Sequence, residues 1–183
     1  MVDQASEDQS KIEAYLQVIQ DRILAPIQST ELRRYCTATL LLLFAAIDGV
    51  GKLLAPGNAA GSTERIRQFL AYMGGDYERC KKELLKLRHS LVHNAINVES
   101  YLSQTETGAD QHLKKIGAAG FIYVDTMVMS HDFVAAFDKF RADIQQNIAM
   151  MKRAADRLEW KEDDPFSDPN VSPPPRAEFI YAG

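Results

Sequence analysis

The sequence predicts a mainly α-helical protein, an antiparallel helical bundle with one small β insertion. Apolar residues recur at intervals of three and four through most of residues 10–158, which is the spacing of helices that bury one face. The pattern changes between about 97 and 128, where short segments rich in β-forming residues are separated by glycines. We therefore expect one domain over residues 1–162, with an antiparallel hairpin or meander inserted before a long last helix.

The composition is that of an ordinary soluble domain, with 183 residues of which 46% are hydrophobic and 25% charged. The net charge of −4 is concentrated at the two ends, and residues 163–183 form a proline-rich acidic tail that we expect to be extended. Residues 11–158 carry nineteen basic and sixteen acidic side chains. This mildly basic body permits a local basic cleft, although it does not require a nucleic acid partner.

The sequence predicts neither a membrane segment nor a secretion signal. The longest apolar run, Thr39–Asp48, is about half the length of a membrane span, and the first ten residues are polar and acidic. The two cysteines, Cys36 and Cys80, lie in apolar helical patterns and indicate no disulfide framework. We therefore expect a cytoplasmic protein with no membrane partner.

Three helices are predicted before the centre of the chain. The first carries an apolar stripe over residues 12–24, and Pro26 is expected to end or kink it. The second covers residues 31–54, and its middle, residues 40–47, is apolar on every side. Such a helix must be surrounded, either by its own bundle or by a partner subunit. A short third helix covers residues 62–73.

The last helix is predicted to be unusually long. Apolar residues keep the helical spacing from Phe133 to Leu158, after a candidate cap at Ser130. At the usual rise per residue this helix would be ~40 Å long, which is more than a compact bundle of this size needs. Two interpretations remain open: the whole helix packs on its own core, or part of it packs on a second subunit.

The helix in the middle of the chain has a basic solvent face. Leu84, Leu87 and Leu91 repeat at three and four and so form its buried face. The residues assigned to the opposite face are polar and mostly basic: Arg79, Lys82, Lys86, Ser90 and His93. A face of this kind suits a bound anion, and a phosphodiester is the most useful one to consider. We predict that Arg79, Lys82 and Lys86 bind the substrate.

Six consecutive residues of this helix resemble the signature of the HEPN superfamily, in which an arginine, often followed by Asn, Asp or His, precedes a histidine by five positions. They are Arg88-His89-Ser90-Leu91-Val92-His93. The resemblance covers six residues in motif and about residues 10–157 in architecture. It implies a helical bundle of HEPN type that pairs its motifs across a homodimer. Many members are metal-independent ribonucleases of toxin–antitoxin and phage-defence systems, whereas others bind RNA or have lost activity.

The motif residues are sufficient for RNA cleavage without a metal. RNA carries its own nucleophile, the 2′-OH, so the enzyme needs an acid–base group and a cation for the charge that develops on the phosphate. The His93 imidazole can serve as the acid–base group, and the Arg88 guanidinium can grip two phosphate oxygens. The product would be a 2′,3′-cyclic phosphate. His89 and Ser90 are auxiliary candidates. His89 either binds the phosphate or orients the site, or it is a surface or interface histidine, and the alternative for Ser90 is a polar-face residue without a role.

The spacing of the two catalytic candidates raises a geometric difficulty. Residues five apart on a straight helix point ~140° away from each other. Arg88 and His93 can act together only if the arginine side chain swings round, if the helix end bends, or if a dimer completes the site. Asp48 is a further auxiliary candidate, because a carboxylate beside an apolar run needs a partner. That partner is either Arg88 or, within the same helix, Lys52.

Two alternatives to a ribonuclease remain. The first is a catalytically inactive helical module that binds RNA, nucleotide or a partner protein, and the second is a purely structural dimer. We expect neither a metal nor another cofactor. His89 and His93 have the spacing of H-x-x-x-H, but no glutamate follows His89 and no third ligand is evident. The favoured interpretation is a homodimeric, HEPN-like RNA endonuclease of toxin or phage-defence type, with RNA as substrate and an antitoxin or partner protein as a further partner.

Overall fold

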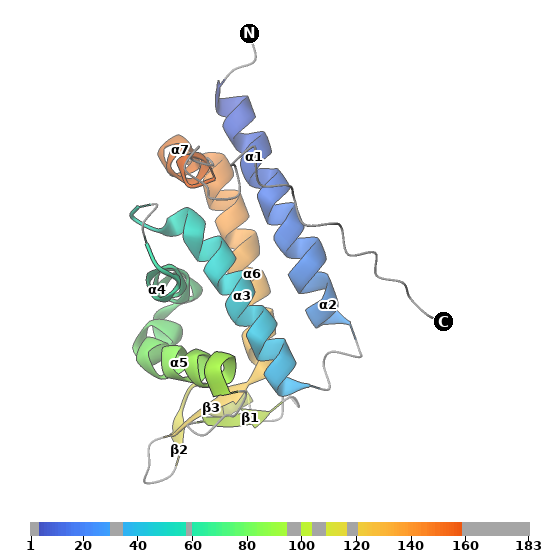
Figure 1. The fold of residues 1–183 in the computed structure, drawn as a ribbon, viewed down its shortest axis with the longest axis vertical. Helices are drawn as coiled ribbons and strands as arrows, with labels where there is room; N and C mark the ends of the chain where they lie inside the picture. Colours follow the sequence, from blue (N-terminus) through green and yellow to red (C-terminus); the bar gives the residue numbers. More distant parts are fainter. Residues whose placement is uncertain are drawn as a thin grey trace, which may run out of the picture.

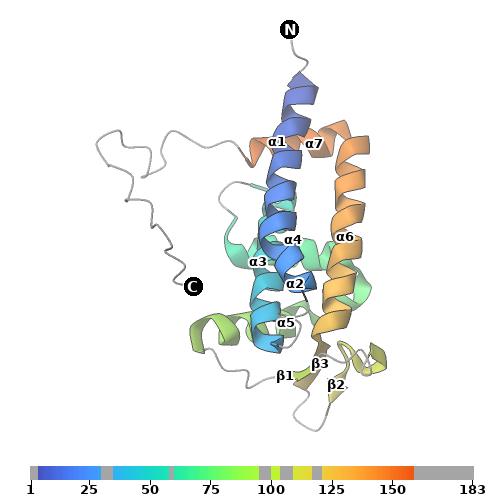
Figure 2. The ribbon, with the colours of Figure 1, turned by 90° about the vertical axis from the view of Figure 1, so that its right-hand side faces the viewer.

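The fold is organised around helix α3 (Cys36–Leu54), which lies at the centre of a helical bundle in the computed structural model (Figure 1). The structure describes residues 4–29, 35–57, 60–94, 100–103, 109–116 and 121–158. The other helices of the bundle are α1 (Gln4–Ile19), α2 (Ala25–Gln28), α4 (Ser62–Met73), α5 (Gly75–Asn94), α6 (Thr126–Gln146) and α7 (Ile148–Asp156). Helices α1, α3 and α6 follow the long axis of the molecule, and α4, α5 and α7 cross them (Figures 1 and 2). The mainly helical bundle that the sequence predicts is confirmed.

The first helix passes Pro26 without ending there. Gln20–Leu24 form a π-helical turn between α1 and α2, and the N–H of Ala25 donates to the carbonyl of Gln20, five residues back. Proline lacks an N–H and its ring collides with the carbonyl four residues earlier in a regular α-helix. The wider turn accommodates Pro26, so the predicted kink takes the form of a π-bulge.

Helix α3 is less enclosed than its sequence suggests. Its buried residues include Leu40, Leu43 and Ile47, but Ala38 and Ala45 on another side are exposed. By length and composition, α3 could also cross a membrane, as could many core helices of globular proteins. Half of its most apolar 18-residue stretch is buried in the bundle. Its apolar middle is therefore covered on most sides, and one side stays open.

The β insertion contains the predicted antiparallel hairpin, but a third strand adds a parallel pair that was not predicted, so the insertion is not an antiparallel meander. The strands β1 (Ser100–Ser103), β2 (Lys115–Ile116) and β3 (Phe121–Asp125) form one sheet in the order β1-β3-β2. β2 pairs antiparallel with β3, whereas β1 pairs parallel with β3. β3 carries the buried residues Ile122 and Val124, and the most apolar strand is the one expected to have neighbours on both sides. A short 3₁₀ helix, Ala109–Gln111, lies between β1 and β2.

The predicted long last helix is wrong, because it is broken at Asn147. The side chain of Asn147 accepts a hydrogen bond from the N–H of Met150 and so caps a new helix, α7. This helix packs against α1 and α3 of the same chain. The excess length therefore gives no argument for a second subunit. The cap of α6 is Asp125 rather than Ser130, since its carboxylate accepts from the N–H groups of Met127 and Val128.

The core extends from α1 and α3 through α4, α5 and α6 to α7 and β3. Phe69 of α4 packs against Phe133 and Phe140 of α6, with ring centroids 5.4 and 6.3 Å away. The sharp turn from α4 into α5 occurs at Gly74, whose φ of 130° is readily adopted by glycine and rarely by other residues. This turn confirms the predicted break at Gly74-Gly75 and sets α4 and α5 side by side. The predicted acidic tail, residues 163–183, lies outside the described residues, as does the end of the predicted domain beyond 158.

Candidate functional site

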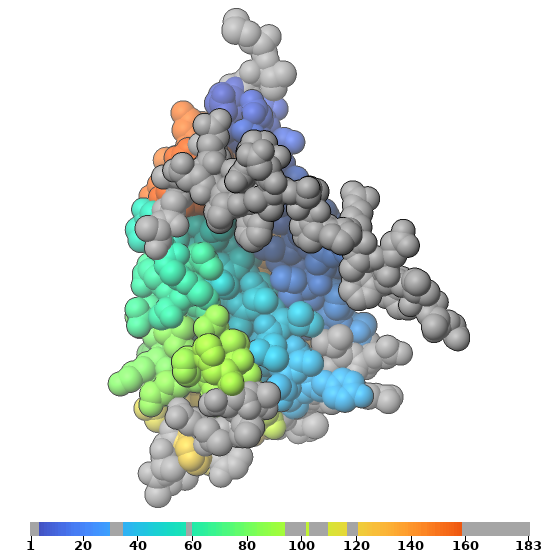
Figure 3. Space-filling view, viewed as in Figure 1, coloured from blue at the N-terminus to red at the C-terminus, as the bar shows by residue number. Residues whose placement is uncertain are grey.

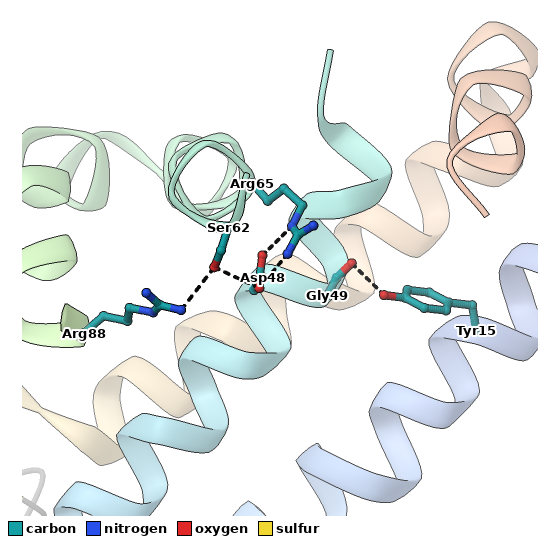
Figure 4. A network of polar contacts seen from close by, with 6 residues as sticks. All are labelled: Tyr15, Asp48, Gly49, Ser62, Arg65 and Arg88. Carbon is teal, nitrogen blue, oxygen red and sulfur yellow. Dashed lines mark hydrogen bonds and ion pairs between the residues drawn. The ribbon is translucent and has the colours of Figure 1, made fainter. Parts of the chain in front are cut away.

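Arg88 is held at the junction of α3, α4 and α5 by a chain of hydrogen bonds (Figure 4). Its Nη2 donates to the Ser62 hydroxyl oxygen at 3.2 Å, and that hydroxyl donates to the Asp48 carboxylate at 3.0 Å. The carboxylate also accepts from Nε and Nη2 of Arg65, at 2.6 and 3.0 Å. The guanidinium of Arg88 is thus fixed on the side of α5 that faces α3 and α4.

The direct Asp48–Arg88 contact that we considered is not present. Asp48 makes its ion pair with Arg65 instead, and Ser62 stands between the carboxylate and Arg88. Among the described residues, the alternative partner Lys52 makes no ion pair with Asp48 either. Asp48 has a charged partner as expected, but the identity of that partner was predicted wrongly. Arg65 and Ser62 are brought to Asp48 only by the packing of α4 on α3.

Helix α4 approaches α3 very closely at this junction. A side-chain carbon on Gly51 would overlap the backbone carbonyl of Arg65, so only glycine allows this approach. Helix α1 also contacts α3 here. The hydroxyl of Tyr15 on α1 donates to the carbonyl oxygen of Gly49 on α3 at 3.1 Å. Burial, reinforced by the Asp48 charge, raises the pKa of Tyr15. Helices α1 and α4 therefore both contact α3 within one turn of Asp48.

The two histidines of the motif lie on the exposed side of α5. The rings of His89 and His93 contact each other, with centroids 4.4 Å apart and planes tilted by 48°. Within the described residues, neither a hydrogen bond nor a ring contact joins Arg88 to His93. The predicted divergence of the two side chains along a straight helix is what the structure shows.

Ser90 is buried, with 7% of its surface exposed, and the prediction that it belongs to the solvent face is wrong. It follows the buried Leu87 by three residues, which places it at the edge of the leucine face. The leucine face itself is confirmed, since Leu84, Leu87 and Leu91 are at most 2% exposed.

A groove of about 880 Å³ runs between α4 and α5. Four of its lining residues are cations: Arg67, Lys81, Lys82 and Lys86. Two are acids, Glu64 and Glu78, which pair with Arg67 and Lys81 respectively. His89 and Ser90 line the end of the groove nearest the motif. The groove therefore joins the predicted basic face to one of the imidazoles.

The three residues predicted to bind the substrate do not all lie at the same place in the structure. Lys82 and Lys86 line the groove, whereas Arg79 does not and is paired with Asp76 on the exposed side of α5. The sequence did not identify Arg67 and Lys81 as groove residues. Arg67 lies on α4, and only the pairing of α4 with α5 shows that it faces the same space.

A buried polar network that the sequence did not reveal lies on the other side of α5. The N–H of Asp125 donates to Nδ1 of His112 at 3.0 Å, so the neutral ring carries its proton on Nε2. That nitrogen is 3.0 Å from the Tyr77 hydroxyl, which donates to Asp132 at 2.7 Å. Burial lowers the pKa of His112 and, together with the Asp132 charge, raises the pKa of Tyr77. The network ties the β insertion to α5 and α6.

The chemistry open to the site is acid–base and electrostatic. Among the described residues, no group of three or more His, Cys, Asp or Glu side chains is placed to hold a metal ion. The arrangement combines a fixed guanidinium, two exposed imidazoles and a basic groove. Searches against protein-family models, curated proteins and solved structures found no match for the chain.

Proposed function

We propose that this chain is a HEPN-like, metal-independent RNA endonuclease in which Arg88 and His93 act on the scissile phosphate. One observation carries the proposal: the Arg88 guanidinium is held through Ser62 by Asp48, and it shares its helix with two exposed imidazoles, of which His89 lines the end of a basic groove. A fixed cation costs no reorganisation when charge develops on a phosphate. Imidazoles are the side chains best suited to proton transfer near neutral pH.

The reaction follows from the RNA's own hydroxyl group. His93 accepts the proton of the 2′-OH, whose oxygen attacks the adjacent phosphorus and forms a new P–O bond. Arg88 stabilises the negative charge on the phosphate oxygens. The bond to the 5′-oxygen breaks, and an acid protonates that oxygen. The products are a 2′,3′-cyclic phosphate and a 5′-hydroxyl end.

The acid and the base must act on opposite sides of the phosphorus, because the attacking and departing oxygens are roughly in line. His89 and His93 are in ring contact, so both belong to one side. We therefore assign the acid to an imidazole of a second copy of the chain. In this arrangement His89 orients His93 and the substrate, and the site is complete only in a homodimer.

An exposed apolar strip supports such a dimer. On α3 it consists of Ala38 and Ala45, which are exposed, and Leu41 and Leu42, which are half-buried. Val92 of α5 is 48% exposed, and α3 and the end of α5 lie side by side on one face of the molecule (Figure 3). Pairing of two copies through this face would bury apolar surface and bring the two motif helices together. Light scattering should give twice the chain mass of 20.5 kDa; a monomer at micromolar concentration would exclude the shared site.

Cleavage is tested by incubating the purified protein with mixed RNA in EDTA and analysing the product ends. We expect cleavage without divalent metal and a 2′,3′-cyclic phosphate. His93→Ala should reduce the rate by at least ~100-fold, the usual scale for loss of an acid–base group. Arg88→Lys should do nearly as much harm, because an ammonium cannot reproduce the two-point grip of a guanidinium. His131→Ala is the matched control, since His131 is an exposed histidine on α6.

Two results would reject the proposal in favour of an inactive module that binds RNA, nucleotide or a partner protein. One is a wild type that cleaves no RNA, and the other is a His93→Ala variant that cleaves equally well. Activity of this kind would suit a cytoplasmic toxin or phage-defence effector, held in check by an antitoxin or partner protein.

A further inference from the structure

The α4–α5 groove has the charge and the position of a channel for a nucleic acid strand. We propose that it binds single-stranded RNA on one side of the scissile phosphate, through Lys82 and Lys86; this inference rests on the proposed function. Lys82 and Lys86 are exposed, and among the described residues neither takes part in an ion pair. Their charge is therefore available to a ligand.

The cations lead directly to the imidazoles. Lys82, Lys86, His89 and His93 follow one another on α5 at intervals of four, three and four residues, which is the spacing of a single helix face. Four residues advance ~6 Å along a helix. A strand whose phosphates contact the two lysines would continue toward His89, at the end of the groove, and then toward His93.

The groove's dimensions favour a single strand. A volume of about 880 Å³ falls within the range of sites that enclose a small organic ligand, so the groove has room for a few nucleotides and not for a duplex. Leu85 and Ala71 supply an apolar surface between the cations. Neither Phe, Tyr nor Trp occurs among the lining residues that the structure describes, and His89 supplies the one aromatic ring among them, so base stacking should contribute little. Binding should depend mainly on phosphates and vary little with base sequence.

Binding can be measured apart from cleavage with a substrate that cannot react. The probe is a fluorescent RNA of mixed sequence in which every ribose is 2′-O-methylated, because such a strand lacks the attacking hydroxyl. Its affinity is measured by anisotropy at several salt concentrations. We expect Lys82→Gln/Lys86→Gln to bind at least ~10-fold more weakly than wild type. The plot of log affinity against log salt concentration should also become less steep, by ~0.7 in slope for each phosphate that the variant no longer neutralises.

The matched control is Lys114→Gln/Lys152→Gln. Both side chains are exposed, both lie outside the groove, and the double change lowers the net charge equally. We expect this control to bind within about twofold of wild type, because the change is not in the groove. A duplex of the same sequence should bind more weakly than the single strand.

The proposal that the groove binds RNA and the proposal that the protein cleaves RNA can be rejected independently. Equal loss of affinity in the groove variant and the control would overturn the groove as the binding channel, even if wild type cleaves RNA. Failure of wild type to bind the probe, or equal affinity for the duplex, would overturn it as well. Selective loss in the groove variant, with no cleavage by wild type, would support the channel and reject the nuclease.

Discussion

The two sides of α5 differ in how firmly they hold their functional groups. On one side, Arg88 is tied through Ser62 and Asp48 to two other helices. On the other, His89 and His93 are exposed and contact each other. The first side is organised by the fold of a single chain, whereas the geometry of the second would be set by the proposed substrate or second copy.

This difference has a physical origin in the helix itself. A turn of helix fixes the direction of each side chain, so neighbouring functional groups can be locked only where other elements pack against them. Helices α3 and α4 meet the Arg88 side, but the imidazoles lie where the bundle is open. We therefore expect that changes at the junction affect stability and Arg88 together, and that changes at the imidazoles affect chemistry alone.

The largest effect on stability is expected from Gly51→Ala. The added methyl group would overlap the carbonyl of Arg65, which is backbone and cannot rotate away. Separation of α3 from α4 should cost about 3 kcal/mol, the upper part of the usual range for overpacking. It should also displace Arg65 and Ser62 and so reduce RNA cleavage. Chemical denaturation measures the loss of stability.

Gly49→Ala is the control for this substitution. Its added methyl group would lie 3.2 Å from the end of the Ile19 side chain and 3.4 Å from the Tyr15 hydroxyl, and both can adjust. Alanine also favours a helix over glycine by about 1 kcal/mol, so the net change should be small. Equal destabilisation by the two substitutions would show that the α3–α4 approach does not depend on residue 51.

Ser62→Ala should have a smaller and more selective effect. Without the hydroxyl, Arg88 loses its hydrogen-bond acceptor, while Asp48 keeps both bonds from Arg65. Loss of one such bond costs about 1 kcal/mol, which corresponds to a rate reduction of roughly fivefold to tenfold if it acts on the transition state. The cleavage rate should fall, and the unfolding midpoint should fall as well, but by less than for Gly51→Ala.

Ser62→Thr tests whether the hydroxyl is responsible. Threonine keeps the oxygen and should restore most of the rate. If Ser62→Ala leaves the rate unchanged, Arg88 is positioned by its packing alone, and the difference between the two sides of α5 is smaller than the hydrogen bonds suggest.

Features that depend on local periodicity could be predicted from the sequence. They are the helices, the buried leucines of α5, the break at Gly74-Gly75 and the position of the β insertion. A run of apolar residues at helical spacing needs no knowledge of its neighbours to be recognised. The prediction of one uninterrupted last helix failed for the same reason, because the apolar spacing continues through Asn147, which caps a new helix.

Features that depend on long-range packing were missed or assigned wrongly. Arg65 and Ser62 reach Asp48 because Gly51 permits close approach of α3 and α4, and nothing in the spacing of these residues shows it. The pairing of β1 with β3 likewise depends on which strand becomes central. The resemblance of residues 88–93 singled out Arg88 and His93, but their relative placement in the proposed shared site would depend on a second chain.

The smallest expected effect concerns the buried imidazole of His112, which contrasts with the exposed pair on α5. Nδ1 of the ring accepts a hydrogen bond from the N–H of Asp125, and Nε2 contacts the Tyr77 hydroxyl. Burial lowers its pKa, although the nearby carboxylates of Asp132, Asp125 and Asp76 act in the opposite direction.

Because the pKa of His112 is lower in the folded state, the unfolded chain binds more protons as the pH falls. The stability contributed by the neutral ring is complete above the unfolded value of about 6.5 and is lost as the pH drops through that value toward the folded pKa. Unfolding midpoints measured between pH 7.5 and 5 should therefore fall more steeply for wild type than for His112→Gln, which cannot titrate there. If His112→Gln keeps the wild-type slope, the protonation of His112 is not coupled to folding.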